Sequence, residues 1–176
     1  MSPFIRLLVS TLMLISVTAC GGLTSSDDPE LNSLEIIDTG GSDSAVVGES
    51  NLLIDADENT TSTDDGEFTL YWDVVSDDDY TFDLYINDDD RINDALTIYS
   101  GVCDEDDDCN EDQMLDCIFQ DDLNLVCDDF NGDDVASVDL GFFTDDFPED
   151  LVFILQVCDP FGFDCEDRSI EARFDD

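Results

Sequence analysis

Short runs in which apolar and polar residues alternate are the feature that most limits how this chain of 176 residues can fold. Two runs show the alternation most clearly, EFTLYWDVV at 67–75 and YTFDLYIN at 80–87. A period of two places alternate side chains on one face of an extended strand, whereas a helix needs a period near 3.6. We therefore expect two strands joined by the turn SDDD. Their expected inward residues are Phe68, Leu70, Trp72, Val74, Tyr80, Phe82, Leu84 and Ile86.

The same pattern predicts further strands along the chain. They are NLLIDA at 51–56, ALTIYSGV at 95–102, SVDLGFF at 137–143, DLVFILQV at 150–157 and RSIEARF at 168–174. The run from Leu151 to Val157 is almost continuously apolar, as in a strand at the centre of a sheet. The expected inward residues of the two flanking runs are Val138, Leu140, Phe142, Ile170, Ala172 and Phe174. Short strands with turn-rich gaps between them predict an all-β sandwich.

Acidic residues outnumber basic ones so strongly that they restrict the partners of the chain. There are 48 Asp and Glu against 4 Lys and Arg, with no His, for a net charge of −44. Of the acids 38 are Asp, which favours turns and loops, so few helices are expected. The charge repels nucleic-acid phosphates and anionic lipid headgroups, which leaves cations, cationic surfaces and neutral molecules as partners. The composition resembles that of proteins from salty habitats.

The N-terminus, MSPFIRLLVSTLMLISVTAC, has one positive charge followed by an apolar run from Leu7 to Val17. That run is about half of what spans a bilayer as a helix, and it is typical of a signal peptide. The segment VTAC at 17–20 resembles the lipobox of bacterial lipoproteins, which implies acylation of Cys20, with palmitate among its acyl chains. Gly21 stands where an Asp would imply the inner membrane, so the resemblance implies the outer membrane. A plain secreted protein cleaved near Ala19 is the alternative.

Three regions follow from these observations. We expect a signal peptide at 1–19, a lipidated flexible tether at 20–48, and a sandwich domain at 49–176 with a cysteine-rich insert at 103–127. The tether is rich in Gly, Ser and Asp, although LEII at 34–37 can also dock as an early strand. The remaining length suits a single domain with a core of its own. Contact with the membrane is expected through the lipid anchor only.

The chain has seven cysteines, and six remain when Cys20 is set aside. An even number in an exported chain implies disulfides. Zinc is the competing interpretation, but no pair has the spacing of a metal knuckle and the chain has no His. We expect sequential pairing, with a shuffled pattern such as Cys103 to Cys127 as the alternative, and one helical turn in NEDQMLDC at 110–117. The six cysteines, in their expected pairs, are Cys103 and Cys109, Cys117 and Cys127, and Cys158 and Cys165.

The order of the strands resembles the immunoglobulin and fibronectin type III sandwiches. The resemblance rests on Trp72, on Tyr80 and on VFILQVCDPFG at 152–162, and it covers roughly 51–174. It implies an immunoglobulin-like antiparallel β-sandwich, to which the cysteine-rich insert is foreign. Because such folds have many unrelated roles, the resemblance implies no particular function.

The sequence does not favour an enzyme, because no His or Lys is present to activate a nucleophile. An acid-pair hydrolase stays a third hypothesis. Calcium is the candidate cofactor, since Ca²⁺ prefers oxygen ligands at alternate loop positions. DFNGDD offers Asp129, Asn131 and Asp133, and DADEN at 55–59 offers a second set, but neither has a Glu at the twelfth position.

The hairpin DPFGFD is the one apolar tip that the sequence predicts to be exposed. Phe161 and Phe163 are therefore the candidate contact surface, toward a protein or glycan partner. Outward Tyr71, Tyr85 and Tyr99 can stack on sugars, which makes a carbohydrate-binding accessory module the alternative function. The preferred hypothesis is a membrane-anchored, acidic, non-enzymatic lipoprotein that displays one interaction or structural domain.

Overall fold

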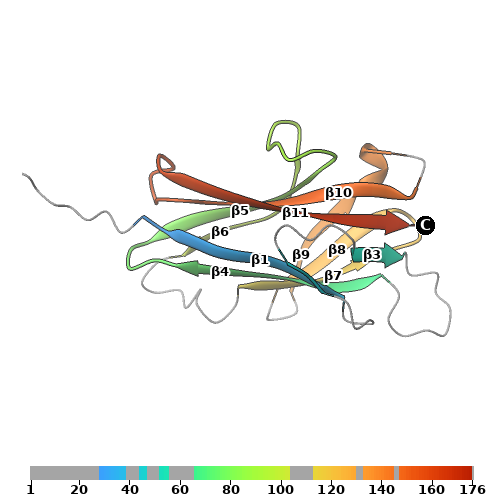
Figure 1. The fold of residues 1–176 in the computed structure, drawn as a ribbon, viewed down its shortest axis with the longest axis horizontal. Coiled ribbons are helices and arrows are strands. Elements are labelled where there is room, and N and C mark those ends of the chain that lie inside the picture. The colour runs from blue at the N-terminus through green and yellow to red at the C-terminus, as the bar shows by residue number, and fades with distance from the viewer. Residues whose placement is uncertain are drawn as a thin grey trace, which may run out of the picture.

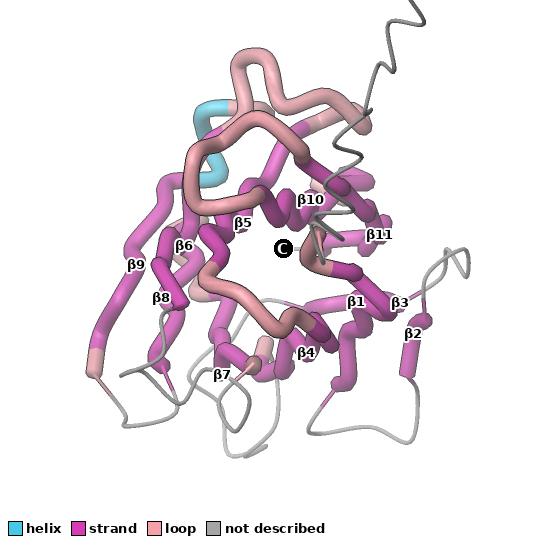
Figure 2. Tube along the Cα trace, turned by 90° about the vertical axis from the view of Figure 1, so that its left-hand side faces the viewer, coloured by secondary structure: helices cyan, strands magenta, loops and turns pink. Residues whose placement is uncertain are grey.

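The structure is a computed structural model, and it describes residues 28–38, 44–46, 52–55, 66–103, 113–129, 133–144 and 147–175. Two β-sheets pack face to face, and their strands run roughly parallel to the long axis of the molecule (Figures 1 and 2). The all-β sandwich predicted from the sequence is confirmed, and the hydrophobic core lies between the two sheets.

The first sheet has six strands, all of them antiparallel to their neighbours. In spatial order they are β2 (Ser44–Val46), β1 (Glu30–Asp38), β4 (Glu67–Val75), β7 (Met114–Phe119), β8 (Asn124–Asp129) and β9 (Asp134–Asp139).

The second sheet has five strands, with the only parallel pair among the described strands at one edge, between β3 and β11. In spatial order they are β3 (Leu52–Asp55), β11 (Cys165–Asp175), β10 (Glu149–Cys158), β5 (Tyr80–Asn87) and β6 (Leu96–Cys103). A single turn of 3-10 helix, η1 (Leu140–Phe142), follows β9.

The predicted inward faces of β4, β5 and β11 are confirmed, because every alternate apolar residue named for them is buried. Aromatic rings fill the centre of the core. Phe174 contacts Phe68, Phe119 and Phe153 at centroid distances of 6.3, 5.1 and 6.1 Å. Rings at these separations stabilise a core beyond the apolar area that they bury.

Phe82 explains why a glycine lies opposite it in the neighbouring strand. Gly101 pairs directly with Phe82, and a Cβ at Gly101 would lie 2.4 Å from two atoms of the phenyl ring. The ring lies over this bare backbone and also contacts Trp72 and Tyr99 at 5.7 and 5.3 Å. Because such a distance is far below van der Waals contact, any larger residue at 101 displaces the ring.

β10 is the central strand of its sheet, as its continuous apolar run predicts. Val152 and Ile154 are buried although they alternate with the core-facing residues and so lie on the outer face of the sheet. Beside Val152, the buried Asn87 donates its side-chain amide to the carbonyl oxygen of Arg91 at 2.7 Å. This bond folds the β5–β6 connection back over the sheet, where Figure 1 shows it rising above β10.

The predicted tether at 20–48 is wrong over its second part. Glu30–Asp38 forms β1, which lies between β2 and β4, and the sandwich therefore begins well before residue 49. Leu31, Leu34 and Ile36 are completely buried in the core. A change of register between Leu31 and Ser33 interrupts the alternation, which is why a period-two pattern did not reveal this strand.

The predicted insert at 103–127 is also corrected, because β7 and β8 are integral strands of the six-stranded sheet. β7 pairs directly with β4, and the helical turn expected at 110–117 is replaced from Met114 onward by this strand. The Gln113 side chain extends the ladder: its Oε1 accepts from the Val74 amide at 2.6 Å and its Nε2 donates to the Val74 carbonyl at 3.1 Å.

The alternation at 137–143 predicts that Phe142 points inward, but Phe142 is 66% exposed. β9 ends at Asp139, whose carboxylate accepts from the Gly141 amide at 2.9 Å and starts the turn of η1. This turn buries Leu140 and directs Phe142 to solvent. The extended alternation predicted through 143 therefore stops after Val138.

Two of the predicted disulfides are present in the described residues. Cys117–Cys127 joins directly opposed residues of β7 and β8 and faces the core. Cys158–Cys165 joins directly opposed residues at the ends of β10 and β11. Cys103 is also disulfide-bonded, and Cys109, its predicted partner, lies outside the described residues.

Candidate functional site

The turn between β10 and β11, residues 159–164, is the most exposed apolar feature of the described structure, and we call it the Phe tip. Phe161 and Phe163 are 78% and 83% exposed, so the predicted exposure of this tip is confirmed, whereas its contact role stays a prediction. Among the other exposed large apolar residues of the described chain, Phe142 comes nearest at 66%. Aromatic rings this accessible are candidates for contact with a partner surface.

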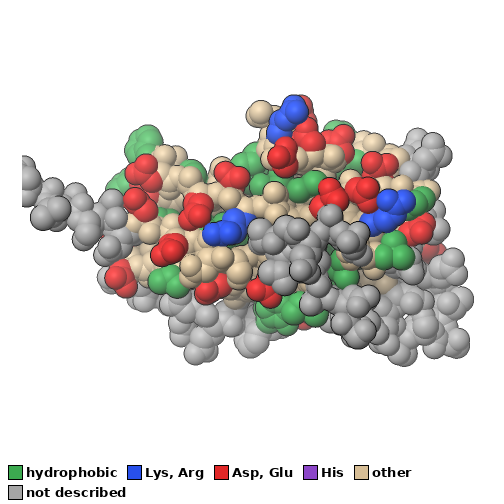
Figure 3. All heavy atoms as spheres, viewed as in Figure 1, with side chains coloured by type: hydrophobic (Ala, Val, Ile, Leu, Met, Phe, Trp, Pro, Cys, Tyr) green, Lys and Arg blue, Asp and Glu red, His purple; other side chains and the backbone are tan. Residues whose placement is uncertain are grey.

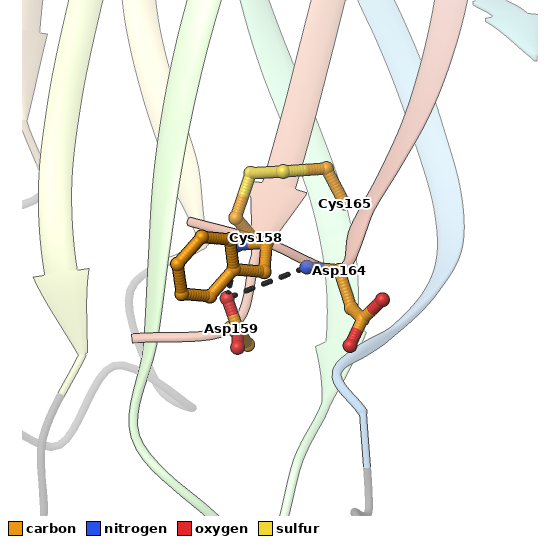
Figure 4. Close-up of a disulfide and its surroundings, with 5 residues drawn as sticks. Cys158, Asp159, Asp164 and Cys165 are labelled. Carbon is orange, nitrogen blue, oxygen red and sulfur yellow. Dashed lines mark hydrogen bonds between the residues drawn. A yellow bond between two sulfur atoms is a disulfide. The ribbon is translucent and has the colours of Figure 1, made fainter. Parts of the chain in front are cut away.

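Several bonds fix the backbone of the Phe tip. The Cys158–Cys165 disulfide closes its base, and the Asp159 amide donates to the Asp164 carbonyl at 2.9 Å. One Asp159 carboxylate oxygen accepts from the amides of Phe163 and Asp164 at 2.6 and 3.4 Å (Figure 4). Gly162 has a φ of +71°, which a residue without a Cβ adopts at little cost. The two phenylalanines are thus presented on an ordered loop.

The Phe tip lies at the end of the sandwich where β1, the first described strand, begins. The Leu31 amide donates to Glu166 Oε2 at 3.1 Å, and Arg168 Nε donates to the Leu31 carbonyl at 2.6 Å. Both side chains belong to β11, the strand that leaves the tip. Figure 1 shows β1 entering the fold at the end where the β10–β11 turn lies.

Two more exposed apolar residues lie at this end. Val75 is the last residue of β4 and is 54% exposed, and Val102 on β6 is 59% exposed. Thr81 pairs with both Val102 and Cys158, so Val102 lies two strands from the base of the Phe tip. Figure 3 shows acidic side chains spread over the visible face and apolar side chains in separate patches, one of them at the end of the molecule where the β10–β11 turn lies.

The candidate calcium loop of Asp129, Asn131 and Asp133 falls at the β8–β9 turn. The Asp129 carboxylate accepts from the Asp133 amide at 3.0 Å, and the Asp129 amide donates to the Asp133 carbonyl at 3.0 Å. These two bonds close the turn, so the Asp129 side chain has a structural role here. Asn131 lies outside the described residues, as do Asp57 and Asn59 of the second candidate loop.

The sequence did not reveal an acidic hollow on the outer face of the six-stranded sheet. The hollow has a volume of about 350 Å³. Its lining includes Glu67 on β4, Asp116 on β7 and Asp128 on β8. Thr69 donates to Asp116 at 2.7 Å. The pairing of β7 with both β4 and β8 brings these acids together. In the part of the chain that the structure describes, no group of three acids or cysteines has a geometry that holds a metal ion.

The three tyrosines suggested for sugar binding do not form a shared platform. Tyr71 is on β4, in the six-stranded sheet, and alternates with buried residues, so it lies on the outer face of that sheet. Tyr85 lies on the outer face of the other sheet, and Tyr99 packs against the core. Burial raises the pKa of Tyr85, and the nearby Asp83 carboxylate adds to the effect.

The described residues contain no helix long and apolar enough to cross a bilayer. The leader at 1–19 and Cys20 lie outside those residues. No protein-family model, curated protein or solved structure matches this chain.

Proposed function

We propose that this chain is an exported lipoprotein, acylated at Cys20, that holds a single non-enzymatic β-sandwich at the surface of a bacterial membrane, outer rather than inner, as a contact domain. The lipobox-like VTAC segment supports the anchor. The observation that carries the contact role is the Phe tip, where two exposed phenylalanines are held on a disulfide-closed turn. A preorganised aromatic surface of this kind loses little conformational entropy when it binds.

The anchor is tested by mass spectrometry of the full chain expressed in a Gram-negative host. We expect the membrane fraction to contain a chain that begins at Cys20 and carries acyl groups on that residue. The matched control, Cys20→Ala, should lose both the acyl mass and the cleavage. An unacylated chain recovered from the soluble fraction would refute the anchor, and cleavage near Ala19 without acylation would establish the secreted alternative.

Calcium binding stays part of the proposal as a property of the β8–β9 turn. The test is thermal unfolding in Ca²⁺, in Mg²⁺ and in chelator at matched ionic strength. A specific site requires that micromolar Ca²⁺ raise the unfolding midpoint while Mg²⁺ does not, and that Asp133→Asn abolish the difference. If all divalent ions act alike, the carboxylates hold only a diffuse layer of counterions.

A further inference from the structure

We propose that the Phe tip contacts the same membrane that holds Cys20, with Phe161 and Phe163 inserted among the lipid headgroups as a second attachment. This inference rests on the proposed acylation of Cys20. It replaces the expectation of contact through the lipid anchor only, and it fixes which end of the sandwich faces the bilayer.

The length of chain between Cys20 and the fold supports this orientation. Only residues 21–27 separate Cys20 from Asp28, the first described residue. Eight Cα-to-Cα steps reach at most about 28 Å when the backbone is fully extended. Three residues later, Leu31 is bonded through both its amide and its carbonyl to Glu166 and Arg168 of β11. The point where the chain joins the fold is thus fixed to the strand that carries the Phe tip.

The opposite end of the sandwich lies much farther from the anchor. β10 spans ten residues from Glu149 to the base of the tip at Cys158, a length of about 33 Å. Phe142 lies beyond the far end, because η1 follows Asp139, which pairs with Asn124 at the distal end of β8. Phe142 therefore offers an exposed phenylalanine that should stay away from the bilayer.

The chemistry of the Phe tip suits the headgroup region of a membrane. Exposed Phe side chains of membrane-surface segments are buried at the boundary between headgroups and acyl chains. The exposed Val75 and Val102 lie at the same end of the sandwich as the Phe tip. Apolar side chains that are buried at the membrane surface add to the attachment that the acyl chains of Cys20 provide. The short link to Cys20 also holds the tip at an effective concentration on the order of millimolar.

Acidic residues around the tip restrict which lipids it tolerates. Asp159 and Asp164 lie within the turn, and Asp77, Asp78 and Asp79 form the exposed β4–β5 turn nearby. Anionic headgroups repel these carboxylates, whereas zwitterionic headgroups have no net charge and do not repel them. The tip should therefore insert into phosphatidylcholine vesicles and insert less as phosphatidylglycerol is added at low salt.

The experiment uses the full, acylated chain reconstituted into phosphatidylcholine vesicles whose acyl chains carry bromine, a short-range quencher of tryptophan fluorescence. Phe161→Trp and Phe163→Trp place a reporter on the tip, and Phe142→Trp is the matched control at the far end. Trp72 is buried and gives the same background in all three variants. We expect the tip reporters to lose at least about half of their added emission while the Phe142→Trp reporter keeps it.

The outcomes separate the candidate occupants of the tip. Quenching of all three reporters alike, or of none, overturns the inference. If the emission of the tip reporters shifts to the blue as protein density rises, and bromine does not quench it, a second copy of the chain is identified as the occupant. Full accessibility of the tip reporters to an aqueous quencher leaves the tip available for a soluble partner. Both of these results also overturn the inference.

A failure of the anchor is recognised separately by mass spectrometry of the Cys20 peptide. If Cys20 carries no acyl group, the proposed anchor fails, and the same reporters are measured on the unacylated full chain added to the vesicles. Bromine quenching there supports insertion of the tip without the anchor, and its absence overturns the inference as well.

Discussion

Asp159 shows how one carboxylate fixes the shape of an exposed turn. Its side chain accepts from the amides of Phe163 and Asp164, while its own amide donates across the turn to the Asp164 carbonyl. Aspartate satisfies backbone amides in this way wherever a chain must turn without a helix or a sheet to supply the partners. In an Asp-rich chain, part of the acidic content therefore stabilises turns.

Replacing Asp159 by Ala should loosen the Phe tip. Loss of a bond to a backbone amide costs about 1 kcal/mol, so hydrogen exchange at the Phe163 and Asp164 amides should accelerate about five- to tenfold. Asp159→Asn is the matched control, because it keeps a side-chain oxygen acceptor and should change exchange less. Equal exchange rates in all three chains would contradict the assigned role.

The raised pKa of Tyr80 predicts that the protein loses stability at alkaline pH. Burial raises the pKa of its hydroxyl above the ordinary value of 10.0, and the nearby Asp73 carboxylate raises it further. Above about pH 10 the unfolded chain releases this proton while the folded chain retains it, so the free energy of unfolding falls as pH rises. Urea unfolding between pH 8 and pH 11 should show a shallower decline for Tyr80→Phe. An unchanged decline would exclude Tyr80 as its source.

The two described disulfides occupy different environments and should contribute differently. Each closes a short loop, of sequence separation 10 for Cys117–Cys127 and 7 for Cys158–Cys165, which corresponds to about 2–3 kcal/mol from chain entropy. Both cysteines of the first pair belong to the core cluster, whereas in the second pair Cys158 is buried outside that cluster and Cys165 is exposed. Only the first pair therefore leaves a core cavity when it is removed.

Urea unfolding of paired Cys→Ala variants tests this difference. Cys117→Ala/Cys127→Ala should cost at least about 1 kcal/mol more than Cys158→Ala/Cys165→Ala, because cavity formation adds to the lost constraint. The second variant should also release the Phe tip, seen as faster exchange at the Phe163 amide. Equal losses in the two variants would show that the core position of Cys117 and Cys127 adds nothing.

β1 should be indispensable, although the composition of its segment is typical of a tether. Leu31, Leu34 and Ile36 are completely buried, and each contributes about 1.5–3 kcal/mol, a sum comparable to the whole stability of a domain. A chain shortened to begin at Glu49 should lack cooperative thermal unfolding, whereas one that begins at Asp28 should retain it. Cooperative unfolding of the shorter chain would mean that β1 is dispensable.

The elements that the sequence predicted correctly are those whose burial is encoded locally. β4, β5 and β11 alternate without interruption, and β10 is apolar throughout, so each strand could be recognised from its own residues. β1 was not recognised as a strand, because a change of register after Leu31 interrupts the alternation of apolar and polar residues. The integration of β7 and β8 depends on pairing with β4, about 50 residues earlier in the chain, and no local pattern records that partner.

Part of the candidate site could likewise be predicted from local sequence, and part could not. The exposure of Phe161 and Phe163 followed from a short polar turn between two strands with cysteines at its ends. The nearness of this turn to the start of β1 depends on Glu166 and Arg168 reaching Leu31, more than 130 positions away in sequence. Only the folded chain brings these residues together.

The charge of the whole molecule should make its stability depend on salt. Against 48 acids, the described chain pairs only Arg91, Arg168 and Arg173 with carboxylates. Salt shortens the Debye length from about 10 Å at 0.1 M to about 3 Å at 1 M and so weakens the repulsion among carboxylates. The midpoint of thermal unfolding should rise by about 5 °C or more over this range.

Choline chloride is the control for this measurement, because its large cation screens charge but does not coordinate carboxylates closely. An equal rise in NaCl and in choline chloride would establish screening as the cause. A rise confined to NaCl would instead indicate sites that prefer small cations. No rise in either salt would contradict the role assigned to repulsion.

The antiparallel pairing of β1 with β4, from Glu30 opposite Val75 to Asp38 opposite Phe68, also determines how the molecule responds to mechanical force. If the anchor at Cys20 is pulled away while the far end of the sandwich is held, the load enters along the axis of β1. It then shears all the hydrogen bonds between β1 and β4 together and does not open them one after another. A sandwich anchored in this way should resist extraction by force far better than one pulled sideways from the edge of a sheet.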